Sequence, residues 1–331
     1  MRKTVDEITR TLSSGGRWLV LMHEKADGDT SGCGVAIASL GLRLKRDVML
    51  GGPDPFPEKY MFMIDEIQYC QLNAIPESFM NEESVVICVD TSNADRSVKG
   101  LLDAKGRATI LNIDHHGDNT KYGDVNWVDQ SASATGEMVT ELLLTAGWGI
   151  TPYEADVLYA AIVTDNGNFS YPSSSERSHE CAVELLRAGA SPGMIAEELE
   201  TNLSPNALRL WARAFARVTL FSDGFCAYYW LTESDFEETG SARHDIENLT
   251  NFLLRIRGVR LAALCTETAD SVRVSLRARS PMSARDIAAR FDGGGHILAS
   301  GCTILEPLDE ALNHLRTEME RHAKTRVSGA G

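Results

Sequence analysis

Long apolar runs are missing from this 331-residue sequence. No run of apolar residues approaches the roughly 20 residues that a membrane-spanning helix needs. The first ten residues mix acids with bases and hold no apolar core, so we expect neither a secretory signal nor membrane association. The sequence therefore predicts a cytoplasmic protein.

Cysteine is sparse and follows no pattern. The seven cysteines include no Cys-x-x-Cys pair, and most of them stand among Val, Ile, Ala or Leu. An odd, scattered set is typical of reduced cysteines that pack as small core residues. It argues against a disulfide framework and against a zinc ribbon.

Positive charge is also in short supply. The 32 lysines and arginines face 47 acidic residues, which gives a net charge of −15. This balance argues against a broad basic surface that would wrap long duplex nucleic acid. It leaves room for a small phosphorylated ligand, because bound cations and a few arginines can make one cleft locally positive.

The remaining composition is that of a globular protein, with 43% hydrophobic and 24% charged residues. The length indicates two domains. Continuous apolar runs over Arg17–Met22, Val85–Val89 and Ala108–Ile113 predict strands buried on both faces, and helical spacing over Gly32–Leu44 separates the first two. Strands that alternate with helices predict an α/β domain with a parallel sheet and helices on both faces.

A second, smaller α/β pattern fills the carboxyl part of the chain. Helices are predicted over Glu180–Leu199 and from Ser204 to about Val218, and Ser283 is predicted to cap another that ends at Asp292. The other expected elements are strands over Phe225–Leu231, Val259–Thr266 and Val272–Arg279, and a helix over Asp245–Ile256. We expect a first domain over 1–198, a connector helix over 199–218, a second domain over 219–326 and a flexible tail over 327–331.

Carboxylates and imidazoles gather where the predicted strands end. His23 follows the first strand, Asp90 the second, and Asp114-His115-His116 the third. Because the carboxyl ends of parallel strands meet at one sheet edge, these groups are expected to converge.

Further carboxylates stand in the same setting. Asp27 and Asp29 lie one residue apart and so can face different sides, and Asp165 follows the helical segment Val157–Val163. The whole set offers ligands for two divalent metal ions, which is the equipment for hydrolysing a phosphate ester.

Each motif alone has a simpler explanation. Asp27 and Asp29 suit a solvated acidic turn, Asp90 suits a helix cap, and Asp165 suits a turn. The four motifs in this order favour the metal sites instead.

The same motifs resemble those of the DHH phosphoesterase superfamily, which is named for the Asp-His-His seen at residues 114–116. The carboxyl part resembles the DHHA1 companion domain, whose glycine-rich signature matches Gly293-Gly294-Gly295-His296. The layout is most similar to bacterial nanoRNase and pAp phosphatases of the NrnA type. Ala26 stands where a proline is common in the family, and Asn166 where a threonine is common.

The resemblance implies a ligand set. One ion would take His23, Asp27 and Asp90, and Asp90 would also bridge to the other. The ligands implied for the second ion are Asp29, Asp90, His115 and Asp165. Manganese is the family's usual ion, with magnesium or cobalt as alternatives. Two such ions about 4 Å apart would activate a bridging water toward phosphorus.

The resemblance also implies roles outside the ligand set. Asp114 would orient a histidine, and His116 would contact the phosphate or assist the leaving group. Arg277, Gly294, Gly295 and His296 would grip the rest of the nucleotide in a cleft between the domains, because arginine has a planar donor fork and glycine permits close approach. Arg273 and Arg279 are interpreted as a solvated strand face.

The resemblance implies a two-metal phosphoesterase that acts as an exonuclease on RNA of two to five nucleotides, as a phosphatase that converts 3′-phosphoadenosine 5′-phosphate (pAp) to AMP, or as both. One alternative is hydrolysis of cyclic-di-AMP or of the linear dinucleotide pApA. A second is a non-catalytic nucleotide-binding regulator, against which the full ligand set argues. Phe169 and Tyr171 suit base stacking and core packing equally. A homodimer stays open.

Overall fold

The computed structural model describes residues 2–64, 67–200, 203–246 and 249–327. The chain divides into two compact units, Met1–Asn202 and Leu203–Gly331. The predicted domain limits at 198, 218 and 326 stay predictions. The predicted tail lies outside the described residues except for Val327, which ends a helix.

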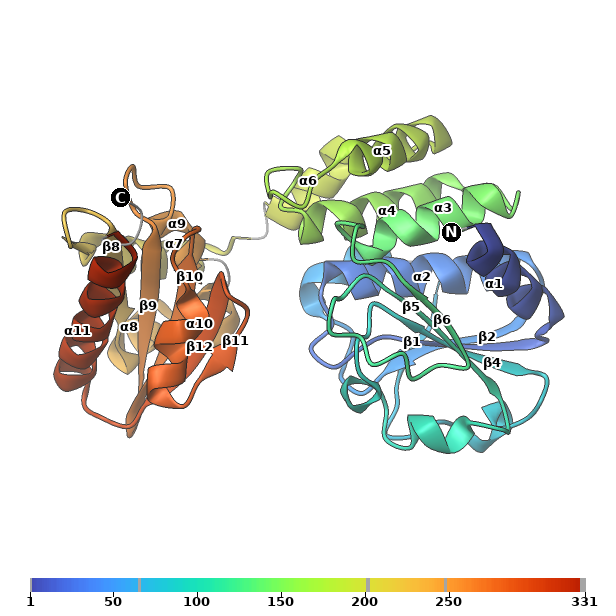
Figure 1. Ribbon diagram of the computed structural model, residues 1–331, viewed down its shortest axis with the longest axis horizontal. Helices are drawn as coiled ribbons and strands as arrows, with labels where there is room; N and C mark the ends of the chain where they lie inside the picture. Colours follow the sequence, from blue (N-terminus) through green and yellow to red (C-terminus); the bar gives the residue numbers. More distant parts are fainter. Residues whose placement is uncertain (1, 65–66, 201–202, 247–248, 328–331) are drawn as a thin grey trace. The chain divides into compact units, whose positions relative to one another are not determined.

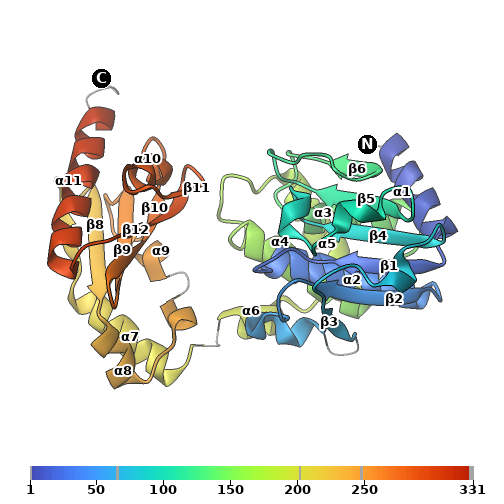
Figure 2. The same ribbon diagram turned by 90° about the horizontal axis from the view of Figure 1, so that it is seen from below.

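The first unit contains a six-stranded sheet in which all neighbouring strands are parallel, as predicted. Figure 2 shows the strand order β3-β2-β1-β4-β5-β6. The bounds are Arg17–Leu21 (β1), Asp47–Gly52 (β2), Tyr69–Gln71 (β3), Ser84–Val89 (β4), Thr109–Asp114 (β5) and Val125–Val128 (β6). Every residue of β4 is buried, which explains its unbroken apolar run.

Helices cover both faces of this sheet. The α-helices pack over one face (Figure 1) and share a core with Trp18, Val20 and Ile87. They are α1 (Arg2–Ser14), α2 (Gly28–Arg43), α3 (Thr135–Thr145) and α4 (Pro152–Asp165), with α5 (Glu176–Ala188) and α6 (Pro192–Glu200) further out. Short 3-10 helices cover much of the other face of the sheet, and they are η2 (Glu77–Phe79), η3 (Ala94–Arg96) and η4 (Leu101–Ala104). A further 3-10 helix, η1 (Glu58–Met63), packs elsewhere in the unit.

Glycines set the close packing of α2 on its neighbours. A Cβ on Gly28 would lie 2.3 Å from Thr164 Oγ1, and one on Gly32 would lie 2.2 Å from the carbonyl oxygen of Val157. A Cβ on Gly136 at the start of α3 would lie 2.9 Å from that of Ala161. Because these positions lack side chains, the beginnings of α2 and α3 approach α4 closely.

The second unit contains a mixed sheet in the order β11-β12-β10-β9-β8-β7, in which β8 and β9 are parallel and the other pairs antiparallel. Its strands are β7 (Thr219–Phe221), β8 (Cys226–Leu231), β9 (Leu261–Thr268), β10 (Ser271–Ala278), β11 (Gly294–Gly295) and β12 (Ala299–Ile304).

Helices of the second unit pack on opposite faces of its sheet (Figure 1). One face carries α10 (Ala284–Ala288) and α11 (Leu308–Val327). The other carries α7 (Pro205–Ala216), α8 (Glu233–Thr239) and α9 (Leu249–Leu253). The 3-10 helices here are η5 (Arg243–Ile246) and η6 (Ala289–Phe291). Ser283 caps α10 as predicted, because its side chain accepts a hydrogen bond from the Asp286 backbone N–H.

Three predicted helices differ in their bounds. The helix predicted over Glu180–Leu199 is two helices, because Gly189 adopts a left-handed φ of 109° and ends α5. Within the segment predicted as a helix over Asp245–Ile256, α9 spans Leu249–Leu253, η5 ends at Ile246, and residues 247–248 lie outside the described ones. Helix α2 begins at Gly28 rather than Gly32, because Asp27 caps it.

The sequence predicts neither a membrane-spanning helix nor a disulfide framework. No helix among the described residues combines the length and apolarity needed to cross a bilayer. All seven cysteines lie in the part of the chain that the structure describes, and none forms a disulfide.

Candidate metal centre

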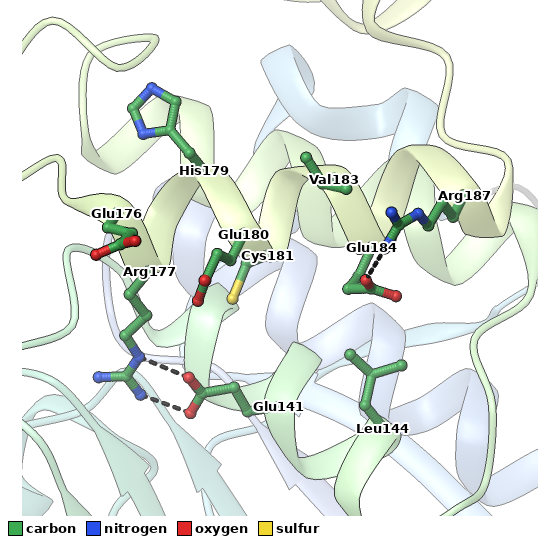
Figure 3. Close-up of a pocket in the computed structure, with 10 residues that line it drawn as sticks. All are labelled: Glu141, Leu144, Glu176, Arg177, His179, Glu180, Cys181, Val183, Glu184 and Arg187. Atoms are coloured by element: carbon green, nitrogen blue, oxygen red, sulfur yellow. Dashed lines mark hydrogen bonds and ion pairs between the residues drawn. The ribbon is translucent and has the colours of Figure 1, made fainter.

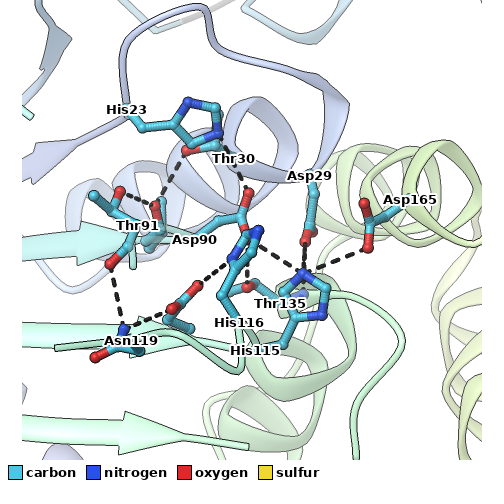
Figure 4. A network of polar contacts seen from close by, with 12 residues as sticks. His23, Asp29, Thr30, Asp90, Thr91, His115, His116, Asn119, Thr135 and Asp165 are labelled. Atoms are coloured by element: carbon cyan, nitrogen blue, oxygen red, sulfur yellow. Dashed lines mark hydrogen bonds and ion pairs between the residues drawn. The ribbon is translucent and has the colours of Figure 1, made fainter. Parts of the chain in front are cut away.

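The predicted metal ligands of the first unit converge at the carboxyl edge of its sheet (Figure 4). His23 follows β1, Asp90 follows β4, and His115 and His116 follow β5. The sheet order places β1 beside β4, and the chain leaves these two strands toward opposite sides of the sheet. Ligands bind at such a switch point in parallel α/β sheets, so topology explains why residues far apart in sequence meet here.

His23 directs Nε2 toward two carboxylates. Nε2 lies 3.7 Å from Asp27 Oδ1 and 3.5 Å from Asp90 Oδ2. Nδ1 lies 2.7 Å from the carbonyl oxygen of Glu24, an acceptor, and 3.2 Å from Arg96 Nη2, a donor, and the shorter contact favours a hydrogen on Nδ1. A histidine held in this way presents Nε2 as a ligand atom.

His115 repeats this arrangement on the other side of Asp90. Its Nε2 lies 3.6 Å from Asp90 Oδ1, 3.5 Å from Asp165 Oδ2 and 4.0 Å from Asp29 Oδ2. Its Nδ1 lies 3.2 Å from the carbonyl oxygen of Ala132. The two oxygens of Asp90 therefore face different histidines, as a bridging carboxylate requires.

The separations in these groups suit coordination better than direct hydrogen bonding. Contacts of 3.5–4.0 Å between histidine nitrogens and carboxylate oxygens are long for hydrogen bonds. Ligand bonds of about 2.1 Å place neighbouring ligand atoms about 3 to 3.5 Å apart. The atoms thus stand close to the spacing that a small divalent cation imposes.

Asp29 is fixed by the start of α3. Its Oδ2 accepts a 2.6 Å hydrogen bond from the Thr135 backbone N–H, and its Oδ1 accepts one of 2.9 Å from that of Gly136. The N-cap residue of α3 is Ala134, whose side chain cannot cap. Asp29 therefore satisfies free N–H groups of a helix that begins more than a hundred residues later.

The electrostatics of the cluster favour a cation. Burial, together with the negative charges of Asp90 and Asp165, raises the pKa of Asp29 well above its usual range. Burial and the charges of Asp90 and Asp27 raise the pKa of Asp165 to about 6, although His115 opposes this. Cations would remove the repulsion that raises these two pKa values, so the donor set fits divalent metal ions.

His23 supports the same conclusion. Burial disfavours charge on this imidazole, but hydrogen bonds and charges from Asp27 and Asp90 outweigh it and raise the pKa of His23 to about 10. A proton on Nε2 thus balances the carboxylates, and a metal ion would replace it.

His116 is bonded differently from the other two histidines. Its Nδ1 lies 2.8 Å from Asp114 Oδ1, and Asp114 Oδ2 accepts a 2.5 Å hydrogen bond from Asn119 Nδ2. The bond to Asp114, with the charge of Asp90, outweighs burial and raises the pKa of His116 to about 9. Burial opposes charge on Asp114, yet the bonds from His116 and Asn119 lower its pKa. The geometry therefore gives His116 the character of a charged donor, oriented by Asp114.

The sequence motifs missed two of the residues that hold this cluster. Thr135 Oγ1 donates a 3.0 Å hydrogen bond to Asp90 Oδ1, and Asn119 bonds Asp114. The one signal for Thr135 was the residue before it, because the N-cap of α3 is Ala134. An alanine side chain cannot accept hydrogen bonds from the first backbone N–H groups of the helix, so these groups need an acceptor from elsewhere in the chain. No sequence signal marks Asn119.

Replacing Thr135 with valine should weaken Mn²⁺ binding about 10- to 100-fold, the usual cost of losing a partner of a ligand. Valine keeps the volume of threonine but removes the donor to Asp90. Titration with Mn²⁺ by electron paramagnetic resonance measures the change. Thr140→Val is the matched control, because Thr140 is also buried in α3 and its hydroxyl bonds only the Gly136 carbonyl. Equal Mn²⁺ affinities for the two variants would contradict the role of Thr135.

The predicted substrate contacts other than His116 lie in the second unit. Arg277 is half-buried on β10, and Gly294, Gly295 and His296 are exposed. A Cβ on Gly293 would lie 2.3 Å from the Gly301 carbonyl oxygen, and Gly295 has a φ of 131°. The close pairing of β11 with β12 therefore requires glycine at 293 and 295, whereas a Cβ on Gly294 would meet no atom within 4 Å. Their predicted contact with substrate stays a prediction.

A hollow of about 540 Å³ lies apart from the cluster's ligands, beside α5 (Figure 3). None of the predicted site residues lines it. Its Arg177 makes two 2.7 Å hydrogen bonds to Glu141 and another to Asp129. Because the arginine is satisfied by carboxylates, this hollow offers no comparable chemistry.

Comparison with known proteins supports the resemblance. The sequence model of the DHH family, N-terminal domain, matches residues 17–162, and that of the DHHA1 domain matches residues 224–324. The bifunctional oligoribonuclease and PAP phosphatase NrnA of Bacillus subtilis (strain 168) is 30% identical over 325 residues, which cover 96% of this chain and 99% of the relative. The predicted metal ligand Asp165 lies just beyond residues 17–162, which the DHH model matches.

Solved structures share the fold. An exopolyphosphatase-related protein from Bacteroides fragilis superposes with a TM-score of 0.89 at 22% identity, with 98% of each chain covered. RecJ from Thermus thermophilus in complex with Mn²⁺ gives a TM-score of 0.54 at 13% identity, covering 98% of this chain and 54% of RecJ. The chain therefore belongs to the DHH family, with a DHH domain followed by a DHHA1 domain.

Proposed function

We propose that this protein is a phosphoesterase that uses two divalent ions, manganese above others, to hydrolyse short oligoribonucleotides and pAp. One observation carries the proposal. His23 and His115 turn their Nε2 atoms toward separate sets of carboxylates that share Asp90. The NrnA relative is named as an oligoribonuclease and PAP phosphatase, and RecJ holds Mn²⁺ on the same fold, which supports the choice of substrate class and metal.

Three groups of these side chains lie close enough together to hold an ion, and the proposal uses two of them. The third group, Asp90, His115 and His116, is set aside because the proposal gives His116 the proton. His23, Asp27 and Asp90 would hold one ion. Asp29, His115 and Asp165 would hold the other, with Asp90 Oδ1 within 3.6 Å of His115. Bound divalent ions supply Lewis acidity, which lowers the pKa of water and offsets charge on the phosphate.

His116 supplies the proton in this proposal. Asp114 and Asn119 orient its ring, and its raised pKa keeps the imidazole protonated near neutral pH. A charged imidazole donates to a phosphate oxygen or to the leaving oxygen as the ester bond breaks. Asp114 acts through His116 in this proposal, because its Oδ1 bonds the imidazole and Asn119 holds its Oδ2 in place.

The second unit would bind the part of the nucleotide that does not react. Arg277 offers a donor fork suited to phosphate. Gly294, Gly295 and His296 are exposed, and the two glycines pair with β12, the strand that also pairs with β10.

A substrate panel tests the proposal. The purified chain is assayed on pAp, RNA of two to five nucleotides, longer RNA and cyclic dinucleotides, with Mn²⁺, Mg²⁺, Co²⁺ or EDTA. We expect phosphate from pAp and mononucleotides from short RNA, only with a divalent ion present.

Other outcomes have defined meanings. Turnover that persists in EDTA, or no turnover of any substrate, would contradict the proposal. Nucleotide binding without turnover would indicate the regulator, and preferred hydrolysis of cyclic-di-AMP or pApA would indicate the dinucleotide phosphodiesterase.

A further inference from the structure

A pocket of about 280 Å³ in the second unit is lined by four arginines. Arg255, Arg257 and Arg260 come from the turn that joins α9 to β9, and Arg279 follows β10. All four side chains are exposed, and the remaining lining residues are apolar or glycine. The pocket therefore concentrates positive charge in a chain whose net charge is −15.

The turn that carries these arginines is held in place by packing and backbone bonds. Val259 is buried in the core beneath α7, α8 and α9, and Ile256 packs against that core. The Val259 N–H donates to the Ile256 carbonyl, and the Arg279 N–H donates to that of Arg260 at 2.8 Å. The arginines are thus presented by a fixed backbone, which favours a binding site over a mobile charged loop.

These arginines lack acidic partners. No carboxylate lines the pocket, and within the described ranges none of the four forms an ion pair. Other arginines of the same unit behave differently, since Arg213 and Arg217 pair with Asp235. Arg260 donates a 3.0 Å hydrogen bond to the Ser280 carbonyl, and the Arg255 guanidinium lies over the Phe252 ring, so neither group is neutralised by its contact. Four arginines around one pocket without counter-charge favour the binding of an anion.

The backbone of the turn adds donors of the same kind. Gly258 has a φ of 95°, and no hydrogen bond from the N–H of Arg257 or of Gly258 is found among the residues that the structure describes. Successive unbonded N–H groups at a left-handed turn are a recurrent anion-binding element.

The pocket adjoins the predicted substrate contacts in the sheet. Arg277 pairs with Ala262 on β9 and Ala299 on β12, and Arg279 lies two residues further along the same chain direction. Gly295 of β11, one of the predicted substrate contacts, pairs with Ser300 of β12, which follows Ala299 in the chain. Alternate residues of a strand share a face, so Arg277 and Arg279 point to the same side.

We propose that this arginine pocket binds phosphodiester groups of an oligoribonucleotide beyond the nucleotide that is hydrolysed. The inference rests on the proposed function. Arginine recognises phosphate through two parallel N–H bonds, and four arginines suit more than one phosphate. A five-nucleotide RNA supplies such distal phosphates, whereas pAp carries only those on its single nucleoside. The pocket would therefore favour RNA over pAp, and Arg279 would have a role that its sequence pattern did not suggest.

The test compares the double variant Arg257→Gln/Arg279→Gln with the wild type. Binding of 3′-labelled pentaadenylate is measured by fluorescence anisotropy in EDTA over a range of salt concentrations, and pAp hydrolysis is measured with Mn²⁺. We expect the Kd for pentaadenylate to rise at least about tenfold, and the slope of log affinity against log salt to fall by about 0.7 for each phosphate that the variant no longer neutralises. Turnover of pAp should stay within about twofold of the wild type, because pAp carries no phosphodiester group beyond its single nucleoside.

Two further variants complete the test. Arg316→Gln/Arg321→Gln makes the same charge change at exposed arginines of α11, on the opposite face of the sheet, and should bind like the wild type. Arg257→Lys/Arg279→Lys keeps the charge without the fork and should bind with intermediate affinity.

The outcomes separate this inference from the proposed function. Pentaadenylate binding by the Gln variant that equals the α11 control would overturn the inference, and so would equal losses for pentaadenylate and pAp. If the wild type hydrolyses nothing while only the pocket variant loses RNA binding, the proposed function fails and the pocket stands. Circular dichroism of each variant confirms folding.

Discussion

Replacing Asp90 with asparagine should reduce hydrolysis of pAp by about 1000-fold or more. Asp90 is the one carboxylate shared by both candidate ion sites, with Oδ2 3.5 Å from His23 and Oδ1 3.6 Å from His115. Its backbone has a φ of 53°, which asparagine also tolerates, so the substitution removes charge with little strain. Turnover with saturating Mn²⁺ measures the loss.

Thermal unfolding gives a second readout for this variant. Ions that bind only the folded chain raise its unfolding temperature, so Mn²⁺ should stabilise the wild type and fail to stabilise Asp90→Asn. Asp103→Asn, at an exposed position in η4, is the control and should respond to Mn²⁺ like the wild type. An Asp90→Asn enzyme with near-normal turnover would refute the shared-ligand role.

Replacing His116 with glutamine should lower kcat about 100-fold or more while the bound metal stays. His116 acts in the proposal as a proton donor, because the bond of its Nδ1 to Asp114 keeps the ring charged. It also belongs, with Asp90 and His115, to a group that could hold a metal ion, so the two roles need a direct test. Metal analysis of the purified variant, together with kcat, separates the two roles. Loss of metal along with activity would show that His116 is a ligand.

The pH profile tests His116 independently. Its hydrogen bond to Asp114 raises its pKa to about 9, and a proton donor is active below its pKa. The kcat of the wild type should therefore fall as the pH rises toward 9, earlier if bound cations offset the charge of Asp90. This alkaline fall should be absent from His116→Gln and unchanged in His244→Gln, whose side chain is 68% exposed.

Much of the first unit's architecture could be predicted from the sequence because buried parallel strands leave unbroken apolar runs. The runs at Val85–Val89 and Ala108–Ile113 became β4 and β5, and the acids and histidines after them stand at the same edge. The start of α2 was missed because Gly28 and Asp29 carry no apolar periodicity. Only the side chain of Asp27, capping the helix, marks its beginning.

The supporting contacts of the site could not be predicted, because tertiary packing creates them. Thr135 reaches Asp90 and Asp29 only through the approach of α3 to α2, across 45 and 106 residues of chain. The arginine pocket was missed for a similar reason. Arg279 looked like part of a solvated strand face, and only the pairing of β10 with β9 brings it to the turn that carries Arg257.

Counting bound Mn²⁺ by electron paramagnetic resonance tests the central claim most directly. The wild type should bind two ions per chain. His23→Gln and Asp165→Asn should each keep one, because each removes a ligand from a different group. Asp90→Asn should keep neither. A wild type that binds no Mn²⁺, or variants that bind as many ions as the wild type, would contradict the claim that these carboxylates and histidines form a two-metal centre.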